Sequence, residues 1–227
     1  MPSVKIPRKS TWTDMTPFVD VAFLILAFFI MATKFKPPQP VEITTPKSVS
    51  ADRLKEQDAV HIEMDKEGRV FFNVTLLKPD ADREVKRTVI NNVNKARNLG
   101  LTDQEIESFV VNSFVGVPLN KLKPYLAMPE KQRSQVFEGI PVKDSANNEL
   151  ATWIAGATNA FYGRKLNFLI KGDNSSKYPS FKGVIEALRR NDIFKYQLIT
   201  EPESVPVGTD LYRLQLSGKD VSTETEQ

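Results

Sequence analysis

A chain of 227 residues that is 41% hydrophobic and 26% charged has the composition of a globular protein, so most of it should lie in water. Its 31 basic and 28 acidic residues nearly balance, which argues against a nucleic-acid partner because such proteins concentrate basic residues on one face. Without cysteine and with a single histidine, His61, the chain lacks thiolate ligands and a multi-histidine set. We expect no metal, no cofactor and no disulfide, and an ordinary strand position for His61.

The apolar segment from Met15 to Phe35 is predicted to be a single transmembrane helix. At about 1.5 Å per residue it covers roughly the 30 Å hydrocarbon core of a bilayer. A cleaved signal peptide is the alternative, because Lys5, Arg8 and Lys9 precede the run. Residues 30–34, IMATK, lack the small-residue cleavage pattern, and an acid interrupts the run, so an uncleaved anchor is favoured.

The topology follows from the lengths on the two sides of this segment. Residues 1–14 are predicted to form a short cytoplasmic tail. The domain-sized remainder is predicted to lie on the far side of the membrane, because long domains are translocated largely regardless of charge.

Asp20 is the candidate functional residue of the segment. A carboxylate inside a membrane helix costs about 2.5 to 3.5 kcal/mol, so it marks a functional position by default. Burial disfavours the charged form, which suits a group that takes up a proton on one side and releases it on the other. The alternative is a shallow Asp20 near the headgroups. If Thr16 caps the helix and Pro17 is its first residue, Asp20 lies about one turn in, whereas with Asp14 as the cap it lies deeper.

One helix cannot hide an acid from lipid by itself. Thr16 is four residues before Asp20 and shares its face, where the hydroxyl can hydrogen-bond the carboxyl group. We expect this face to pack against a second copy or another membrane protein. Its predicted members are Thr16, Asp20, Leu24 and Ala27.

Residues 14–24, DMTPFVDVAFL, resemble the signature of the ExbD/TolR family, in which D-x-T-P-x-x-D opens a single transmembrane helix. The resemblance implies that Asp20 is the family's essential protonatable aspartate. It also implies a homodimer inside a ring of an ExbB/TolQ-like polytopic protein in the bacterial inner membrane, with the C-terminal domain in the periplasm. In the ExbD branch of the family the proton motive force energises TonB and thereby the uptake of siderophores or vitamins. In the TolR branch it energises envelope maintenance. The motif does not separate these branches.

Residues 36–56 are rich in proline and are predicted to form an extended periplasmic linker. Within it Val41, Glu42 and Ile43 alternate like a short strand and resemble the family's short apolar segment before a proline. This segment either pairs with a neighbouring chain or is a plain tether, and the sequence leaves both interpretations open.

Residues 57–215 are predicted to form an α+β domain. Val60–Asp65 and Val70–Val74 alternate with period two around a turn, which indicates a β-hairpin. Leu166–Lys171, Tyr178–Asn191 and Tyr196–Thr200 read as a βαβ unit. Both pieces resemble the αβ sandwich of the ExbD/TolR periplasmic domain. The helix face expected to cover the sheet carries Phe181, Ile185 and Leu188.

About residues 75–165 separate the hairpin from the βαβ unit. This segment is longer than the corresponding segment expected in the short family members, and it is predicted to be a large helical insertion. Helices are expected near 79–98, 102–114, 129–138 and 148–162, and we find no candidate chemistry in them. The polar turn that follows Lys171, Asp173 to Ser176, is either solvated or a partner contact, and residues 216–227 are expected to be disordered.

The sequence therefore predicts a non-enzymatic stator subunit that uses the proton motive force to energise TonB-dependent outer-membrane uptake. A TolR-like envelope protein is the nearest alternative. A membrane-tethered periplasmic binding module without a proton role comes next, and an exported enzyme is disfavoured because no nucleophile, base and orienting group cluster in the sequence.

Overall fold

The structure is a computed structural model that describes residues 15–32, 41–49, 58–76, 83–133, 135–144, 147–204, 207–209 and 212. It divides into two compact units, residues 1–39 and 40–227, and each is described by itself. The predicted cytoplasmic tail and the predicted C-terminal tail lie outside the described residues.

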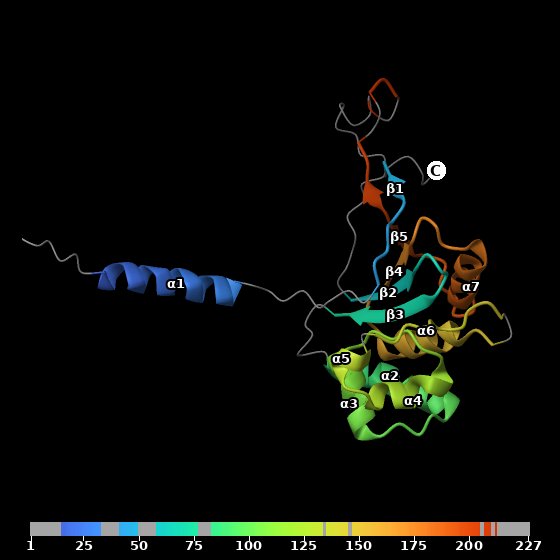
Figure 1. Ribbon diagram of the computed structural model, residues 1–227. Helices are drawn as coiled ribbons and strands as arrows, with labels where there is room; N and C mark the ends of the chain where they lie inside the picture. Colours follow the sequence, from blue (N-terminus) through green and yellow to red (C-terminus); the bar gives the residue numbers. More distant parts are fainter. Residues whose placement is uncertain are drawn as a thin grey trace, which may run out of the picture. The chain divides into compact units, whose positions relative to one another are not determined.

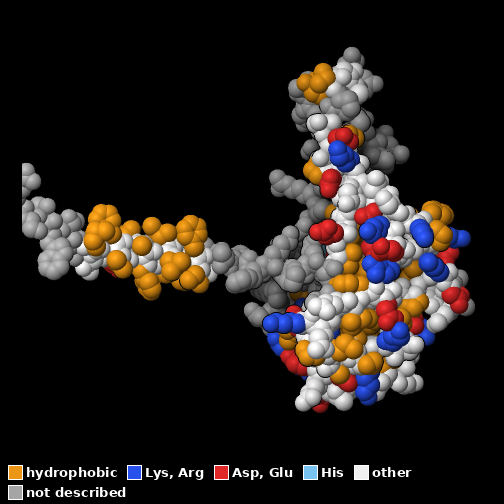
Figure 2. Space-filling view, viewed as in Figure 1, with side chains coloured by type: hydrophobic (Ala, Val, Ile, Leu, Met, Phe, Trp, Pro, Cys, Tyr) orange, Lys and Arg blue, Asp and Glu red, His pale blue; other side chains and the backbone are white. Residues whose placement is uncertain are grey.

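In the first unit the described helix is α1 (Thr16–Ala32), and apolar side chains cover its visible surface (Figure 2). The carbonyl of Met15 accepts hydrogen bonds from the N–H groups of Phe18 and Val19, both at 3.1 Å. The helix thus begins at Thr16, one residue earlier than expected from a Thr16 cap. Pro17 is its second residue, where the missing N–H costs nothing.

The second unit is built on a four-stranded sheet in the order β3-β2-β4-β5 (Figure 1). β2 (Ala59–Met64) and β3 (Val70–Thr75) pair antiparallel as the predicted hairpin. β4 (Asn167–Gly172) pairs parallel with β2 and with β5 (Gln197–Ile199), which confirms the predicted βαβ unit. The register places Ile62 opposite both Phe72 and Ile170, so one face of the sheet carries a continuous row of large apolar side chains.

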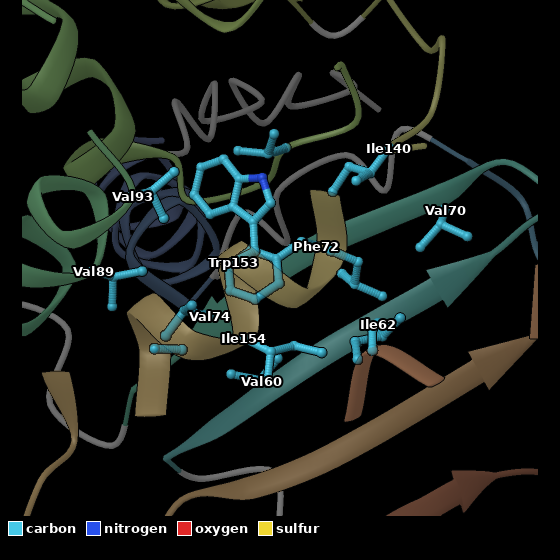
Figure 3. Close-up of a cluster of buried hydrophobic side chains, with 14 of the residues drawn as sticks. Val60, Ile62, Val70, Phe72, Val74, Val89, Val93, Ile140, Trp153 and Ile154 are labelled. Carbon is cyan, nitrogen blue, oxygen red and sulfur yellow. The ribbon is translucent and has the colours of Figure 1, made fainter. Parts of the chain in front are cut away.

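That face is covered by α2 (Arg83–Arg97), α6 (Glu149–Ala160) and α7 (Tyr178–Arg189) (Figure 1). Trp153 of α6 lies at the centre of the core, with its ring 5.2 Å from that of Phe72 (Figure 3). The sequence prediction treated residues 75–165 as an insertion beside the family domain. In the structure α2 and α6 form one core with the sheet, so this segment supplies most of the helical layer.

The rest of this segment adds α3 (Asp103–Val111), α4 (Leu119–Ala127) and α5 (Glu130–Arg133). The predicted capping box of α3 is present, because Thr102 and Glu105 bond each other's backbone N–H groups. The helix expected over 129–138 is wrong in length, since α5 ends at Arg133. The helix α4 was missed because Pro124 lies inside it, and proline is normally a helix breaker.

The face of α7 also differs from the prediction. Leu188 is buried as expected, but Phe181 and Ile185 are only half-buried. Phe181 and Ile185 pack at the edge of the core, and the small residues Ser180 and Gly183 join Val184, Ala187 and Leu188 on the buried face. A Cβ on Gly183 would lie 2.3 Å from the carbonyl oxygen of Val142.

Candidate functional site

Asp20 lies four residues after Thr16 in α1, roughly 6 Å along the helix axis. The helix start at Thr16 lies between the starts expected from a Thr16 cap and from an Asp14 cap, so Asp20 is one residue further into the helix than the shallower prediction. Helical spacing places Asp20 on the same face as Thr16 and Leu24. The predicted site residues of the apolar segment therefore share one side of one helix.

The large apolar side chains of α1 are exposed all round the helix, for example Phe18 at 67% and Leu24 at 61%. A helix that is apolar on every side is stable in water only when something covers it. None of the helices in the described part of the chain combines the length and the apolar character needed to cross a membrane. The expected span 15–35 continues beyond Ala32 into residues outside the described ranges.

The predicted linker segment is attached to the domain in this structure. Val41 and Ile43 are half-buried and lie outside the strands formed within this single chain. The strand of this segment is instead β1 (Lys47–Ser48), which pairs parallel with β6 (Glu201–Pro202) of the same chain. Thr44 and β1 of this segment therefore contact their own domain, while pairing of Val41, Glu42 and Ile43 with a neighbouring chain stays a prediction.

Asp173 contributes hydrogen bonds to this docking. Its carboxylate accepts a hydrogen bond from the backbone N–H of Thr44 at 3.0 Å and another from the N–H of Ser175 at 2.8 Å. The backbone N–H of Asn174 in turn donates to the carbonyl of Thr44 at 2.8 Å. The polar turn therefore contacts residues 41–49 of the same chain, and a contact of this turn with another molecule stays a prediction.

The hairpin turn beside this docking point is held by a second carboxylate, Asp65, which is 1% exposed. Asp65 accepts hydrogen bonds from the backbone N–H of Arg69 at 2.8 Å and from its guanidinium at 2.5 Å. The buried hydroxyl of Ser180 donates to the carbonyl of Gly68 at 2.7 Å, which joins the turn to the start of α7. The sequence predicted the hairpin turn but gave no signal for its contact with α7.

The opposite face of the sheet carries titratable groups in neighbouring strands. Glu63 of β2 lies in register with Lys171 of β4, and His61 occupies the predicted strand position. Burial raises the pKa of Glu63, and the positive charge of Lys171 offsets part of that rise. Among the described residues no group of three His, Asp or Glu side chains is arranged to hold a metal ion.

The hydrogen bonds to Asp173 lead to a pH prediction. The backbone N–H groups of Ser175 and Thr44 lower the pKa of Asp173 below its usual value of 3.8. A lowered pKa means that the carboxylate stabilises the docked linker above about pH 4, and that this contribution is lost as the pH falls through the lowered value. We expect the hydrogen-exchange protection factor of the Thr44 amide to fall on acidification. The change should be modest, about fivefold, because solvent screens an exposed site.

The matched control for this prediction is Asp173→Asn. The variant should show low protection of Thr44 already at neutral pH and little further change on acidification. Equal protection at pH 6 and pH 3 in the unaltered chain would contradict the role of the Asp173 carboxylate.

Comparison with known families gives one match. The sequence model described as "Biopolymer transport protein ExbD/TolR" matches residues 8–203, which include α1, the linker and both halves of the sheet. No curated protein and no solved structure shows a significant match to the chain. Because the match covers most of the 227 residues, the chain belongs to the ExbD/TolR family of biopolymer transport proteins.

Proposed function

We propose that this chain is the proton-conducting stator subunit of an inner-membrane motor that energises TonB-dependent uptake across the outer membrane. Proteins of the ExbD/TolR family energise biopolymer transport and generally work with ExbB/TolQ and TonB/TolA partners from an inner-membrane anchor. The observation that carries the proposal is the combination in α1 of an all-round apolar surface with one acid, Asp20, near its start.

The physical argument starts from the exposed apolar surface of α1. Lipid or membrane-protein neighbours would remove it from water at a gain of about 25 cal/mol per Å². The described helix has 17 residues, about 25 Å at 1.5 Å each, so a crossing of a roughly 30 Å core also uses flanking residues. Under the proposal the N-terminus is cytoplasmic and residues 40–227 are periplasmic.

Asp20 needs a polar environment inside that membrane. The face with Thr16 and Leu24 supplies it under the proposal by packing against a second copy within an ExbB/TolQ-like ring. One elementary charge crossing 100 mV releases about 2.3 kcal/mol, so each proton can bias a conformational step but repeated passage is needed for work. The domain beyond the linker then transmits the motion to a TonB-like protein.

The experiment that tests this function deletes the gene that encodes this chain in its native bacterium and measures two phenotypes. Under the proposal the deletion strain fails to grow when a ferric siderophore is its only iron source, and growth returns when the chain is supplied again. Its resistance to detergent should be unchanged, because envelope maintenance is the task of the TolR branch. Detergent sensitivity with normal iron uptake would move the chain to that branch. Normal behaviour in both assays would leave only the tethered binding module.

A further inference from the structure

Large apolar side chains are exposed along α7 and the edge strand β5. β5 ends the strand order of the sheet, and α7 joins β4 to it (Figure 1). The exposed fraction is 73% for Tyr178, 70% for Phe194, 51% for Leu198 and 37% for Tyr196. Soluble monomers seldom leave a group of such side chains in water unless the patch binds something. Neither Asp20 nor the docked linker accounts for this surface.

The register of the sheet places these side chains on one side of the domain. Leu198 pairs with Ile170, whose side chain points to the helix-covered face, so Leu198 lies on that face beside α7. Phe194 and Tyr196 alternate in phase with Leu198, the spacing at which side chains of an extended chain share a side. β5 runs parallel to β4, so the chain returns along α7 and Tyr178 lies toward the other end of this stripe. The exposed residues of 177–198 are named the α7–β5 surface.

The α7–β5 surface is also basic. Its exposed cations include Lys177, Lys182, Arg189 and Lys195. Even without Arg190 these four outnumber the acids of the segment, Glu186 and Asp192. The acids of β6 follow β5 beside the docked β1, where Glu203 lies 4.0 Å from Lys47. Basic side chains around exposed aromatic rings are typical of a surface that lies on an anionic bilayer, because the rings enter the headgroup region while the cations stay at the phosphates.

The chain itself keeps this surface near the membrane that holds α1. Residues 33–43 join α1 to Thr44, so this link cannot extend beyond about 40 Å, which is about the diameter of a domain of this size. Thr44 is docked on the polar turn that Asp173 opens, directly before α7. The tether therefore reaches the domain beside the start of the α7–β5 surface, and the lipid is present at a high effective concentration.

We propose that the α7–β5 surface docks on the anionic lipid headgroups of the membrane that anchors α1. Its lysines and Arg189 lie at the lipid phosphates, and its aromatic rings lie among the headgroups. Charge favours lipid over a second copy of the chain, because a symmetric contact would bring two basic surfaces together. The docking rests on the membrane anchor of the proposed function and not on its proton role. Docking holds the domain close to the bilayer, and release allows the full reach of the tether.

The test is the accessibility of a spin label on the full chain in lipid nanodiscs. Because the chain has no cysteine, Glu186→Cys places a single nitroxide on α7 and removes only a weak surface ion pair with Lys182. Nanodiscs of phosphatidylcholine are compared with nanodiscs that also contain phosphatidylglycerol. We expect collisions with a water-soluble nickel complex to fall about threefold or more in the anionic nanodiscs. High salt should reverse this fall, because it screens the charges.

Variants of the labelled chain separate this surface from the general charge of the domain. The charge variant combines Lys182→Gln, Arg189→Gln and Lys195→Gln. It should restore the collisions in anionic nanodiscs, because each cation near an anionic surface changes the ratio of docked to free domain about fivefold. The matched control removes three exposed lysines outside the surface, with Lys95→Gln, Lys143→Gln and Lys165→Gln. It loses the same net charge and should stay shielded.

The apolar part of the surface is tested separately. Phe194→Ser should also restore collisions in anionic nanodiscs, and circular dichroism checks that each variant keeps the fold. Equal and high collision rates in both nanodiscs, or equal losses in the matched control, would overturn the docking and leave the proposed function standing. Equal shielding in both nanodiscs would overturn it in favour of a protein neighbour. A chain that does not enter nanodiscs would overturn the docking together with the membrane anchor of the proposed function.

Discussion

Replacing Asp20 by asparagine is expected to abolish growth on ferric siderophore while the protein still accumulates in the membrane with its partners. Asparagine has nearly the size of aspartate and can form similar hydrogen bonds, but it cannot take up or release a proton. If the carboxyl group carries protons, the loss is complete rather than partial. The measurement pairs the growth assay with co-purification of the polytopic ring partner.

Two further variants serve as controls for Asp20→Asn. Asp20→Glu keeps a titratable group on the same helix face and should retain part of the activity. Asp103→Asn removes an exposed acid in the first turn of α3 and should leave growth unchanged. Full activity of Asp20→Asn would reject the proton role and leave Asp20 as a residue that only orients the helix.

The strands and the principal helices of the domain could be predicted from the sequence because their patterns are local. Alternation with period two located β2 and β3 within a residue of their ends, and the Thr102–Glu105 pair located the start of α3. The element α4 could not be found in the same way. Its packing against neighbouring helices overrides the helix-breaking tendency of Pro124, and no local pattern reports that packing.

The contacts between distant elements were beyond sequence reasoning for the same reason. Asp173 and Thr44 are 129 residues apart, and nothing near either of them predicts a hydrogen bond. Ser180 and Gly183 belong to the buried face of α7 through close approach, but small residues give no hydrophobic signal. Asp20 was the opposite case, since an acid in an apolar run is conspicuous in the sequence alone.

The joint role of the helical segment and the family sheet has a consequence for stability. If residues 75–165 were a separate insertion, damage to α6 would leave the sheet intact. The structure instead places Trp153 of α6 against Phe72 of β3 and Phe109 of α3, at ring distances of 5.2 and 5.6 Å. Removal of this side chain should therefore destabilise the sheet and the helices together, so that both unfold in one transition.

Trp153→Ala is expected to lower the free energy of unfolding by about 3 to 5 kcal/mol, because the indole is fully buried and its removal leaves a large cavity. Urea denaturation of the full chain in detergent, followed by circular dichroism, measures this change. Trp153→Phe is the matched variant and should lower the free energy of unfolding much less.

The indole Nε1 has no hydrogen-bond acceptor among the described residues, so phenylalanine removes an unsatisfied donor while it keeps most of the ring. Separate unfolding transitions for strands and helices in Trp153→Ala would contradict a shared core, whereas one cooperative transition at lower denaturant is the outcome that the packing requires.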